Sequence, residues 1–319
     1  MAGEVVRVHD RVWQIQSPFI GGGLVMLYLV RGSKLGIIDT GVASSPGDDV
    51  RPALKDIGLD MTDVNAILNT HGHHDHLGGN GNFKEAAPDA EIHLHEDDRP
   101  FAEANSHHFH RTFMTEWLRA LGREDQVAER QAVFVKTLSS GDAGVDRVLH
   151  DGDKVDLGGG VELTVIHTPG HTPGSVCYYW EAEKMLFTGD AVQGRGSRVG
   201  GWPLYFGAQT YRSSIRRLVD VSIETMCLGH GFHSGVPLNR PVRRGAEAKQ
   251  LVVESGELWD KIDAVVRARL AKHPNASSFE IAHGATMDLL ATVPTLLDPV
   301  LNLPGSAATL WAHIKEARG

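Results

Sequence analysis

Two kinds of hydrophobic pattern divide the chain into a strand-rich part and a helical tail. Alternating or continuous apolar residues predict strands in EVVRVHD, VWQIQ, LVMLYLV, LGIIDT and VNAILNT, with turn residues between them. A second half repeats this plan in VELTVIHT, SVCYYW, KMLFTGD and TMCLGHG. Because helical segments separate these strands, we predict an α/β fold in which two mixed sheets pack together with helices outside, a four-layer αβ/βα sandwich.

Helical spacing of apolar residues predicts two additions to this sandwich. Between about residues 97 and 140 the aromatic and leucine positions recur every three or four residues, which indicates a helical insertion. Strand signals vanish from residue 241 onward; residues 246–270 have helical spacing, and a last helix is expected over about residues 306–317. We therefore predict a main domain over residues 1–240 and a C-terminal helical cap over residues 241–319.

Charge and composition narrow the class of protein. Acidic and basic residues are mixed along the 319 residues, with a formal net charge of −9, so no basic face is available for nucleic acid. The longest apolar stretch, residues 21–30, is too short to span a bilayer, and we expect a cytoplasmic protein without membrane contact. Cys177 and Cys227 lie in apolar runs, which favours reduced, buried thiols. Trp259 and Trp311 in the predicted cap suit a homodimer interface as well as a core.

Histidine is unusually frequent, with 18 copies, and it is concentrated in the segment HGHHDH, residues 71–76. Imidazole and carboxylate groups are the usual ligands of zinc and similar divalent ions. One ion could not use all of them, so His71 and His73 would point to one ion and Asp75 and His76 to a second, about 3.5–4 Å away. The alternative is a polar histidine cluster that faces solvent.

Three further candidate ligands occur where predicted strands end. His171 lies in HTPGHTPGS, whose proline and glycine residues fix a rigid loop, and His167 is its competitor four residues earlier. Asp190 closes the buried run KMLFTGD, where a carboxylate is costly unless a positive group meets it; the alternative is a helix cap. His230 stands between glycines in LGHG. Because chemistry is often placed on the loops at strand ends, we expect these residues to join the HGHHDH segment.

The motifs HGHHDH, PGHTPGS, FTGD and LGHG, in this order, resemble those of the metallo-β-lactamase superfamily over about residues 4–234. The resemblance is to its broad hydrolase branch, which includes thioesterases, lactonases and glyoxalase II-type enzymes. It implies the metallo-β-lactamase sandwich, with residues 1–240 as the catalytic domain, and it implies that Asp39 in the IDTG motif orients ligand side chains. The implied metal ligands are His71, His73 and His171 for a first ion, Asp75, His76 and His230 for a second, and Asp190 as the bridge.

The resemblance further implies a hydrolase with two divalent metal ions as cofactors, Zn²⁺ being favoured and Mn²⁺ or Fe²⁺ being alternatives. A hydroxide bridging the metals would attack the carbonyl carbon of an ester, lactone or thioester, and Asp75 would pass a proton to the leaving group. Two other classes stay open: a di-iron oxidoreductase, and a hydrolase of non-carbonyl bonds such as phosphoesters. A β-lactamase is disfavoured, because Asp190 would bridge the metals and no signal peptide is recognised.

A glycine-rich loop after Asp190 supplies candidates for a pocket that takes a small-molecule substrate. Its aromatic residues would stack on an acyl group, and its arginines would meet a carboxylate or phosphate. A surface loop with one aromatic anchor is an equal alternative. Gln193 stands where acyl-homoserine lactonases carry a tyrosine, and no basic C-terminal set for glutathione is recognised. The pocket candidates are Gln193, Arg195, Arg198, Trp202, Tyr205, Phe206, His107, His110 and His233.

Overall fold

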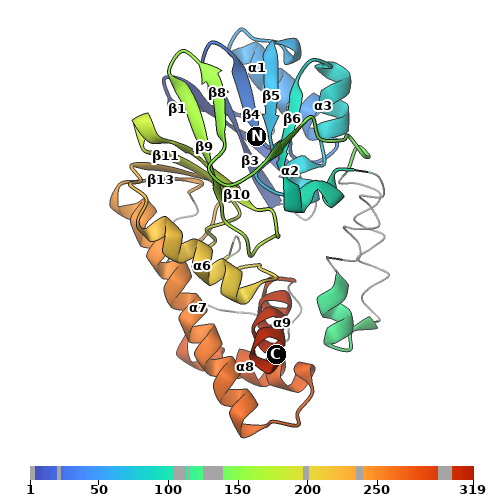
Figure 1. The fold of residues 1–319 in the computed structure, drawn as a ribbon, viewed down its shortest axis with the longest axis vertical. Coiled ribbons are helices and arrows are strands. Elements are labelled where there is room, and N and C mark those ends of the chain that lie inside the picture. The colour runs from blue at the N-terminus through green and yellow to red at the C-terminus, as the bar shows by residue number, and fades with distance from the viewer. Residues whose placement is uncertain are drawn as a thin grey trace.

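The strands form two mixed sheets that pack face to face, so the fold class predicted from the sequence is confirmed. The computed structural model describes residues 4–19, 23–103, 113, 115–124, 139–196, 201–234, 240–293 and 304–319. In Figure 1 the two sheets occupy the upper part of the molecule, and the long C-terminal helices lie below them. The loops at the lower ends of the strands therefore lie between these two parts.

The strands of the first sheet are Val5–His9 (β1), Val12–Phe19 (β2), Gly23–Arg31 (β3), Leu35–Ile38 (β4), Val64–Leu68 (β5), Glu91–His95 (β6) and Arg147–Leu149 (β7). They lie side by side in chain order, β1 to β4 antiparallel and β4 to β7 parallel. Parallel neighbours need crossover connections. Helical segments in these connections include Pro46–Val50 (η2), Arg51–Asp56 (α1), Met61–Asp63 (η3), His74–Leu77 (α2), Asn80–Ala86 (α3) and Glu96–Phe101 (η4).

The strands of the second sheet are Lys154–Gly158 (β8), Val161–His167 (β9), Val176–Trp180 (β10), Met185–Gly189 (β11), Thr225–Leu228 (β12) and Val242–Arg244 (β13). Their order in the sheet is β13-β12-β11-β10-β9-β8. A short helix, Glu181–Glu183 (η5), joins β10 to β11. The β11 and β12 strands are parallel, and the helix Ala208–Val219 (α6) lies in the connection between them.

The prediction that strands end before residue 241 is wrong. The β13 strand pairs antiparallel with β12 and forms one edge of the second sheet. Its three residues, of which two are arginines, are too few to show an alternating pattern in the sequence. The second sheet therefore extends past the boundary proposed at residue 240, and the division into two domains remains a prediction.

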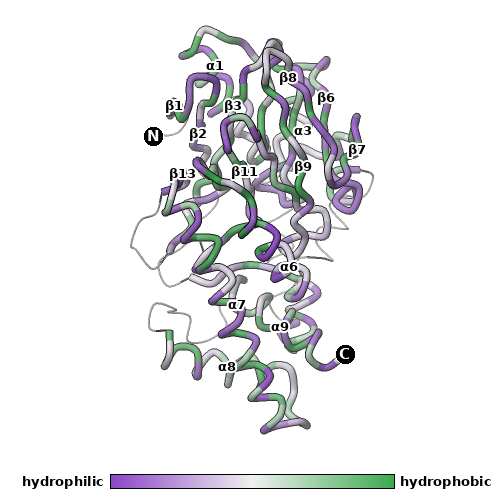
Figure 2. The backbone as a smooth tube through the Cα atoms, turned by 60° about the vertical axis from the view of Figure 1, so that its left-hand side comes forward, coloured by the Kyte–Doolittle hydropathy of each residue, from purple (hydrophilic) through white to green (hydrophobic). Residues whose placement is uncertain are grey.

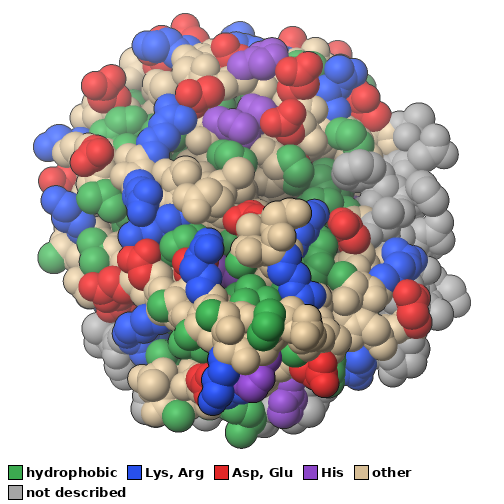
Figure 3. Space-filling view, turned by 60° about the horizontal axis from the view of Figure 1, so that its bottom comes forward, with side chains coloured by type: hydrophobic (Ala, Val, Ile, Leu, Met, Phe, Trp, Pro, Cys, Tyr) green, Lys and Arg blue, Asp and Glu red, His purple; other side chains and the backbone are tan. Residues whose placement is uncertain are grey.

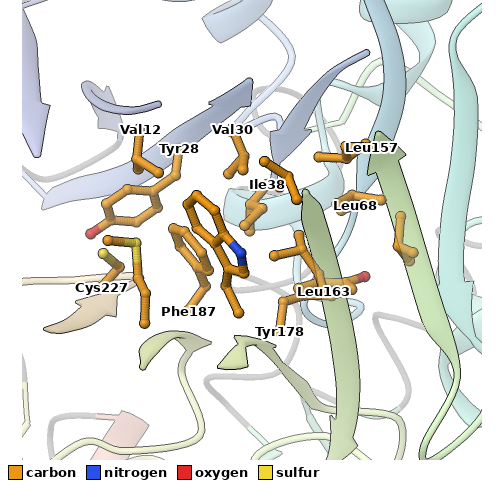
Figure 4. Close-up of a cluster of buried hydrophobic side chains, with 14 of the residues drawn as sticks. Val12, Tyr28, Val30, Ile38, Leu68, Leu157, Leu163, Tyr178, Phe187 and Cys227 are labelled. Atoms are coloured by element: carbon orange, nitrogen blue, oxygen red, sulfur yellow. The ribbon is translucent and has the colours of Figure 1, made fainter. Parts of the chain in front are cut away.

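Apolar side chains from both sheets fill the space between them. Figure 4 shows Tyr28 and Ile38 of the first sheet facing Phe187 and Tyr178 of the second. The ring centroids of Tyr28 and Phe187 are 5.5 Å apart, in an edge-to-face arrangement. The tube in Figure 2 is correspondingly hydrophobic along many of the strands. Dense packing of this core holds the strand ends in fixed positions.

The C-terminal part contains the helices Ala246–Lys272 (α7), Ser278–Thr292 (α8) and Pro304–Arg318 (α9). They share a hydrophobic cluster with Trp117 of the predicted insertion and with Trp202. Trp259 and Trp311 are 8% and 7% exposed and pack in hydrophobic clusters within the chain. The homodimer remains a prediction. Among the described residues, no helix combines the length and the apolar character needed to cross a bilayer.

Only part of the predicted insertion over residues 97–140 is described. Residues 97–101 lie in η4, and residues 115–120 are helical, as the spacing predicts. The remaining described positions of the segment are residues 102, 103, 113, 121–124, 139 and 140. His107 and His110 lie outside the described residues.

The two cysteines are buried and free, as predicted. Burial raises the pKa of the Cys177 thiol to about 12, and burial raises the pKa of Cys227 as well. Because the thiolate is the reactive form, we expect neither cysteine to react with a disulfide reagent in the native protein at pH 8. Both should react after unfolding in guanidinium. A native protein in which one thiol reacts at the rate of a small-molecule thiol would contradict this prediction.

Candidate metal centre

Histidine and aspartate side chains converge at the carboxyl ends of strands from both sheets. The β5 strand leads into residues 71–76, β9 into His171, β11 into Asp190 and β12 into His230. Two separate groups of three have their ligand atoms within 4.8 Å of one another: His71, His73 and His171, and Asp75, His76 and His230. A third group, made of His71, His76 and Asp190, meets the same distance and links these two. The structure thus brings all seven predicted ligands to one place.

Asp190 lies between the two groups. Its Oδ2 atom is 3.5 Å from Nε2 of His171 and 3.4 Å from Nε2 of His230. Its Oδ1 atom is 3.5 Å from Nε2 of His76. One carboxylate therefore faces imidazoles of both groups, which is the position that a bridging ligand requires.

The imidazole nitrogens point at one another across the cluster. Nε2 of His71 and Nε2 of His171 are 3.2 Å apart, and Nε2 of His76 and Nε2 of His230 are also 3.2 Å apart. Two protonated nitrogens would repel each other at this distance, so at least one Nε2 atom of each pair carries a lone pair. Such a lone pair is available to a cation that lies between the rings.

Burial and charge place His71 and Asp190 in the protonation states that bind metal. Burial, and then the neighbouring imidazoles, lower the pKa of His71 well below its usual value, which favours the neutral ring. Burial alone would raise the pKa of Asp190, but the lowering effect of the His230 and His76 imidazoles is larger. The pKa therefore lies below its usual value, and the carboxylate is ionised. The buried Oδ1 atom of Asp190 receives no hydrogen bond from the described residues. Such an oxygen is costly unless a cation meets it, and the donor set therefore fits divalent metal ions.

Two glycines make room for the cluster. A Cβ atom at Gly72 would lie 2.2 Å from the ring of Phe101, and one at Gly229 would lie 2.6 Å from Oδ1 of Asp190 and 2.8 Å from Cε1 of His76. Any side chain at these positions would displace the ring or the candidate ligands. The glycines beside the histidines in HGHHDH and LGHG are thus needed for close approach of the backbone.

Asp39 lies beneath His76 and fixes the orientation of its ring. Nδ1 of His76 donates to Oδ2 of Asp39 at 2.8 Å, while Thr70 donates its N–H and its hydroxyl to the two carboxylate oxygens at 2.7 and 2.8 Å. Asp39 adopts a φ of 61°, a left-handed conformation that costs a residue other than glycine about 1–3 kcal/mol. This geometry is the one that the resemblance implies for a residue orienting a metal ligand.

Backbone carbonyls orient two more of the imidazoles. Nδ1 of His230 donates to the carbonyl of Leu24 at 2.6 Å, and Nδ1 of His171 donates to the carbonyl of Leu204 at 2.5 Å. The predicted pocket residue Gln193 is buried beside His171, where its amide accepts from Leu204 N–H and donates to the carbonyls of Leu204 and Asp190. Gln193 therefore joins two loops around His171. In both imidazoles the Nε2 atom is left facing the cluster.

Comparison with known proteins agrees with this geometry. The family model of the metallo-beta-lactamase superfamily matches residues 20–230. The chain belongs to this superfamily. It is 29% identical over 228 residues to the acyl-coenzyme A thioesterase MBLAC2 of Gallus gallus, covering 69% of this chain and 77% of that protein. It is 31% identical over 214 residues to a hydroxyacylglutathione hydrolase of Rhodospirillum rubrum, covering 65% of this chain and 62% of that protein.

A solved structure supports the same fold. The crystal structure of a metallo-beta-lactamase family protein from Thermus thermophilus matches with a TM-score of 0.68 at 24% identity, over 98% of this chain and 94% of that chain. The match extends well beyond the residues of the family model, so it includes the C-terminal helices of this metallo-β-lactamase superfamily member.

Asp98 is a buried residue of the site that sequence reasoning missed. It begins no motif and lies in the acidic run EDDRP, which reads as a solvated surface. Its carboxylate accepts the N–H of Gly72 and the N–H of Gly174, both at 2.7 Å, and the hydroxyl of Thr172 at 2.6 Å. It thus joins the HGHHDH loop to the loop that carries His171.

Replacing Asp98 with asparagine is expected to lower the free energy of unfolding by about 1–3 kcal/mol, the cost of leaving a buried donor unsatisfied. An amide has one acceptor oxygen where the carboxylate has two, so it cannot accept from Gly72, Thr172 and Gly174 together. Denaturant unfolding of the metal-free protein measures the change. Asp97→Asn is the control, since the Asp97 side chain is 51% exposed. Equal unfolding midpoints for the two variants would contradict this role of Asp98.

Tyr205 and Trp202 do not reach the pocket predicted for them. Tyr205 is fully buried, its ring stacks on Tyr211 at 4.3 Å, and its hydroxyl lies 2.8 Å from Nε2 of His313. Trp202 is 4% exposed and packs in the cluster formed with the C-terminal helices. Nδ1 of His313 in α9 lies 3.2 Å from Oδ1 of Asp263 in α7. Both helices therefore help to hold Tyr205 in the protein interior.

The other pocket candidates lie in different surroundings. Phe206 is partly buried, and its ring lies 6.0 Å from that of His73 and 4.6 Å from that of Phe113. Arg195 and His233 are adjacent, because Arg195 N–H donates to the carbonyl of His233 at 2.9 Å. Arg198 lies outside the described residues, as do the histidines predicted at positions 107 and 110.

Proposed function

We propose that this chain is a dinuclear metal-dependent hydrolase that cleaves an ester, lactone or thioester bond. The observation that carries the proposal is the placement of Asp190 between two groups of three candidate ligands. Membership in the metallo-β-lactamase superfamily supports a metal-dependent hydrolase. The choice of bond rests on relatives named as an acyl-coenzyme A thioesterase and a hydroxyacylglutathione hydrolase.

In this proposal His71, His73 and His171 would hold one divalent ion, Asp75, His76 and His230 would hold a second, and Asp190 would contact both. Bound ions would supply Lewis-acid chemistry and make a hydroxide nucleophile available at neutral pH. The residues around them keep the ligands in place: Asp39 holds His76, and the carbonyls of Leu24 and Leu204 hold His230 and His171.

Asp75 is suited to move a proton to the leaving group. Its side chain is 21% exposed, more than that of Asp190 at 9%, and its Oδ2 atom lies 3.3 Å from Nε2 of His230. Burial alone would raise the pKa of Asp75, but His76 and His230 lower it more, so the pKa lies well below its usual value. The ionised carboxylate can accept a proton during attack and release it to the departing oxygen or sulfur.

The aromatic residues beside His73 favour a substrate with an apolar acyl group. Phe113 and Phe206 are partly buried and lie with their rings 6.3 and 6.0 Å from that of His73. An acyl chain or aromatic ring that packs against them would bring its carbonyl next to the cluster. We therefore expect apolar acyl thioesters and esters to be cleaved faster than acetylated ones.

A panel of p-nitrophenyl esters, lactones and acyl thioesters, each with short and long acyl groups, tests this function on metal-loaded protein. Wild type should hydrolyse at least one class far faster than Asp75→Asn, which keeps the size of the side chain but cannot accept the proton. Bound metal is counted in both proteins, so that loss of proton transfer is separated from loss of metal. If no substrate distinguishes wild type from the variant, the carbonyl-hydrolase proposal fails.

A further inference from the structure

A second group of metal-ligating side chains lies outside the seven-residue cluster. His95 ends β6, Asp97 lies in η4, and His167 ends β9, so the group spans both sheets. One ligand atom from each of the three lies within 4.8 Å of the other two. Oδ2 of Asp97 is 3.8 Å from Nδ1 of His95 and 3.9 Å from Nε2 of His167.

The chemistry of these donors suits a transition metal ion. Burial lowers the pKa of His95 to about 4, with a further contribution from His167, so the His95 ring is neutral at pH 7. Neutral imidazole is the form that binds metal, and an added carboxylate completes a set typical of zinc and its neighbours. His95 is 6% exposed and therefore anchored, while the Asp97 side chain is 51% exposed and His167 is 24% exposed, which gives an ion access from solvent.

We propose that His95, Asp97 and His167 form a separate site for a divalent transition-metal ion such as Zn²⁺, Ni²⁺ or Cu²⁺. The ion would tie the end of β6 to the end of β9. Because Asp97 precedes Asp98 and His167 lies four residues before His171, it would also brace the two loops that Asp98 joins.

Binding requires a small rearrangement of the present contacts. The two imidazole rings are stacked at 4.0 Å with an interplanar angle of 14°, and an ion must lie close to the plane of each ring that binds it. His167, the more exposed ring, would tilt toward Asp97 and release its contact with the carbonyl of Pro173, now at 2.9 Å. Nδ1 of His95 would release the N–H of Asp97, now at 3.2 Å. Since contacts must be exchanged, this site should bind more weakly than the seven-residue cluster.

Histidine and acidic side chains lie next to one another at several places on the surface of the protein (Figure 3), so proximity alone does not make a site. Two other histidines show the difference. His150 pairs with Glu96 at 3.2 Å with its ring 6.3 Å from that of His95, and it could add a fourth ligand from the open side. His9 lies 3.5 Å from a single carboxylate, Glu183, and belongs to no group of three among the described residues.

Equilibrium dialysis of metal-free protein against Zn²⁺, followed by elemental analysis, tests the proposal. Wild type should bind one equivalent more per chain than either Asp97→Asn or His167→Gln, and His9→Gln should bind as much as wild type. In Cu²⁺-loaded protein, the two site variants should lack one electron paramagnetic resonance signal with nitrogen coupling. Neither Asp97 nor His167 is one of the seven candidate ligands around Asp190, so both variants should keep the metal bound there, which separates this site from the proposed catalytic centre.

Equal Zn²⁺ binding by wild type, Asp97→Asn and His167→Gln would overturn the inference. An equal loss in His9→Gln would also overturn it, because binding would then reflect scattered surface histidines. Neither result would bear on the proposed hydrolase function, which depends on the ligands around Asp190.

Discussion

Replacing Asp190 with asparagine is expected to lower kcat by about three orders of magnitude and to reduce the amount of metal bound. The expected factor corresponds to about 4 kcal/mol, the several kcal/mol that metal ions contribute to stabilising a charged transition state. The amide lacks the negative charge that faces His76, His171 and His230, so it cannot offset the charge of two cations. Initial rates on the best substrate, together with metal analysis of the same preparations, measure both effects.

Asp89→Asn is the control for this prediction, because Asp89 is exposed and the charge change is the same. Circular dichroism shows whether both variants are folded. If Asp190→Asn kept its metal content and its kcat within tenfold of wild type, Asp190 would not be the residue that joins the two groups.

Replacing Asp39 with asparagine is expected to weaken metal binding by about 10- to 100-fold, the usual effect of losing a partner that orients a ligand. Asparagine tolerates the left-handed backbone conformation seen at this position, so the change is confined to the side chain. The carboxylate now accepts from His76 and twice from Thr70, and an amide would present an N–H to at least one of these donors. Competition with a chromophoric chelator measures the affinity.

Asp49→Asn is a matched control, since Asp49 is as buried as Asp39 but accepts a hydrogen bond from Ser17. Both variants should lose stability, and only Asp39→Asn should lose metal affinity. Equal metal affinities for wild type and Asp39→Asn would contradict the prediction. Asp39 would then stabilise the fold without affecting how His76 binds metal.

The candidate ligands were predictable because local sequence determines their placement. HGHHDH follows a strand, while HTPGH, FTGD and LGHG each begin in the last residues of one, and the ends of these strands meet at one edge of the sandwich. The long apolar run of β3 and the alternating pattern of β9 made these strands predictable as well. The strands β7 and β13 have only three residues each, too few to show a period of two, and pairing with longer neighbours makes them strands.

Other parts of the site depend on contacts between distant residues, and no local pattern could indicate them. Asp98 reads as one more surface acid until tertiary structure brings Gly72 and Gly174 to its carboxylate. Tyr205 sits in a glycine-rich loop that suggests a surface, yet its hydroxyl contacts His313, 108 residues further along the chain. The C-terminal helices thus contact the loop whose Leu204 carbonyl orients His171. The sequence of these helices gives no sign of this contact.

Anomalous diffraction at the zinc absorption edge, from crystals of metal-loaded protein, tests most directly whether seven side chains hold two metal ions. We expect two peaks about 3.5–4 Å apart, with ligand atoms about 2.0–2.2 Å from each. One peak should lie among His71, His73 and His171, the other among Asp75, His76 and His230, with Asp190 touching both. A single peak, or a pair of peaks that leaves Asp190 without a metal contact, would contradict this expectation.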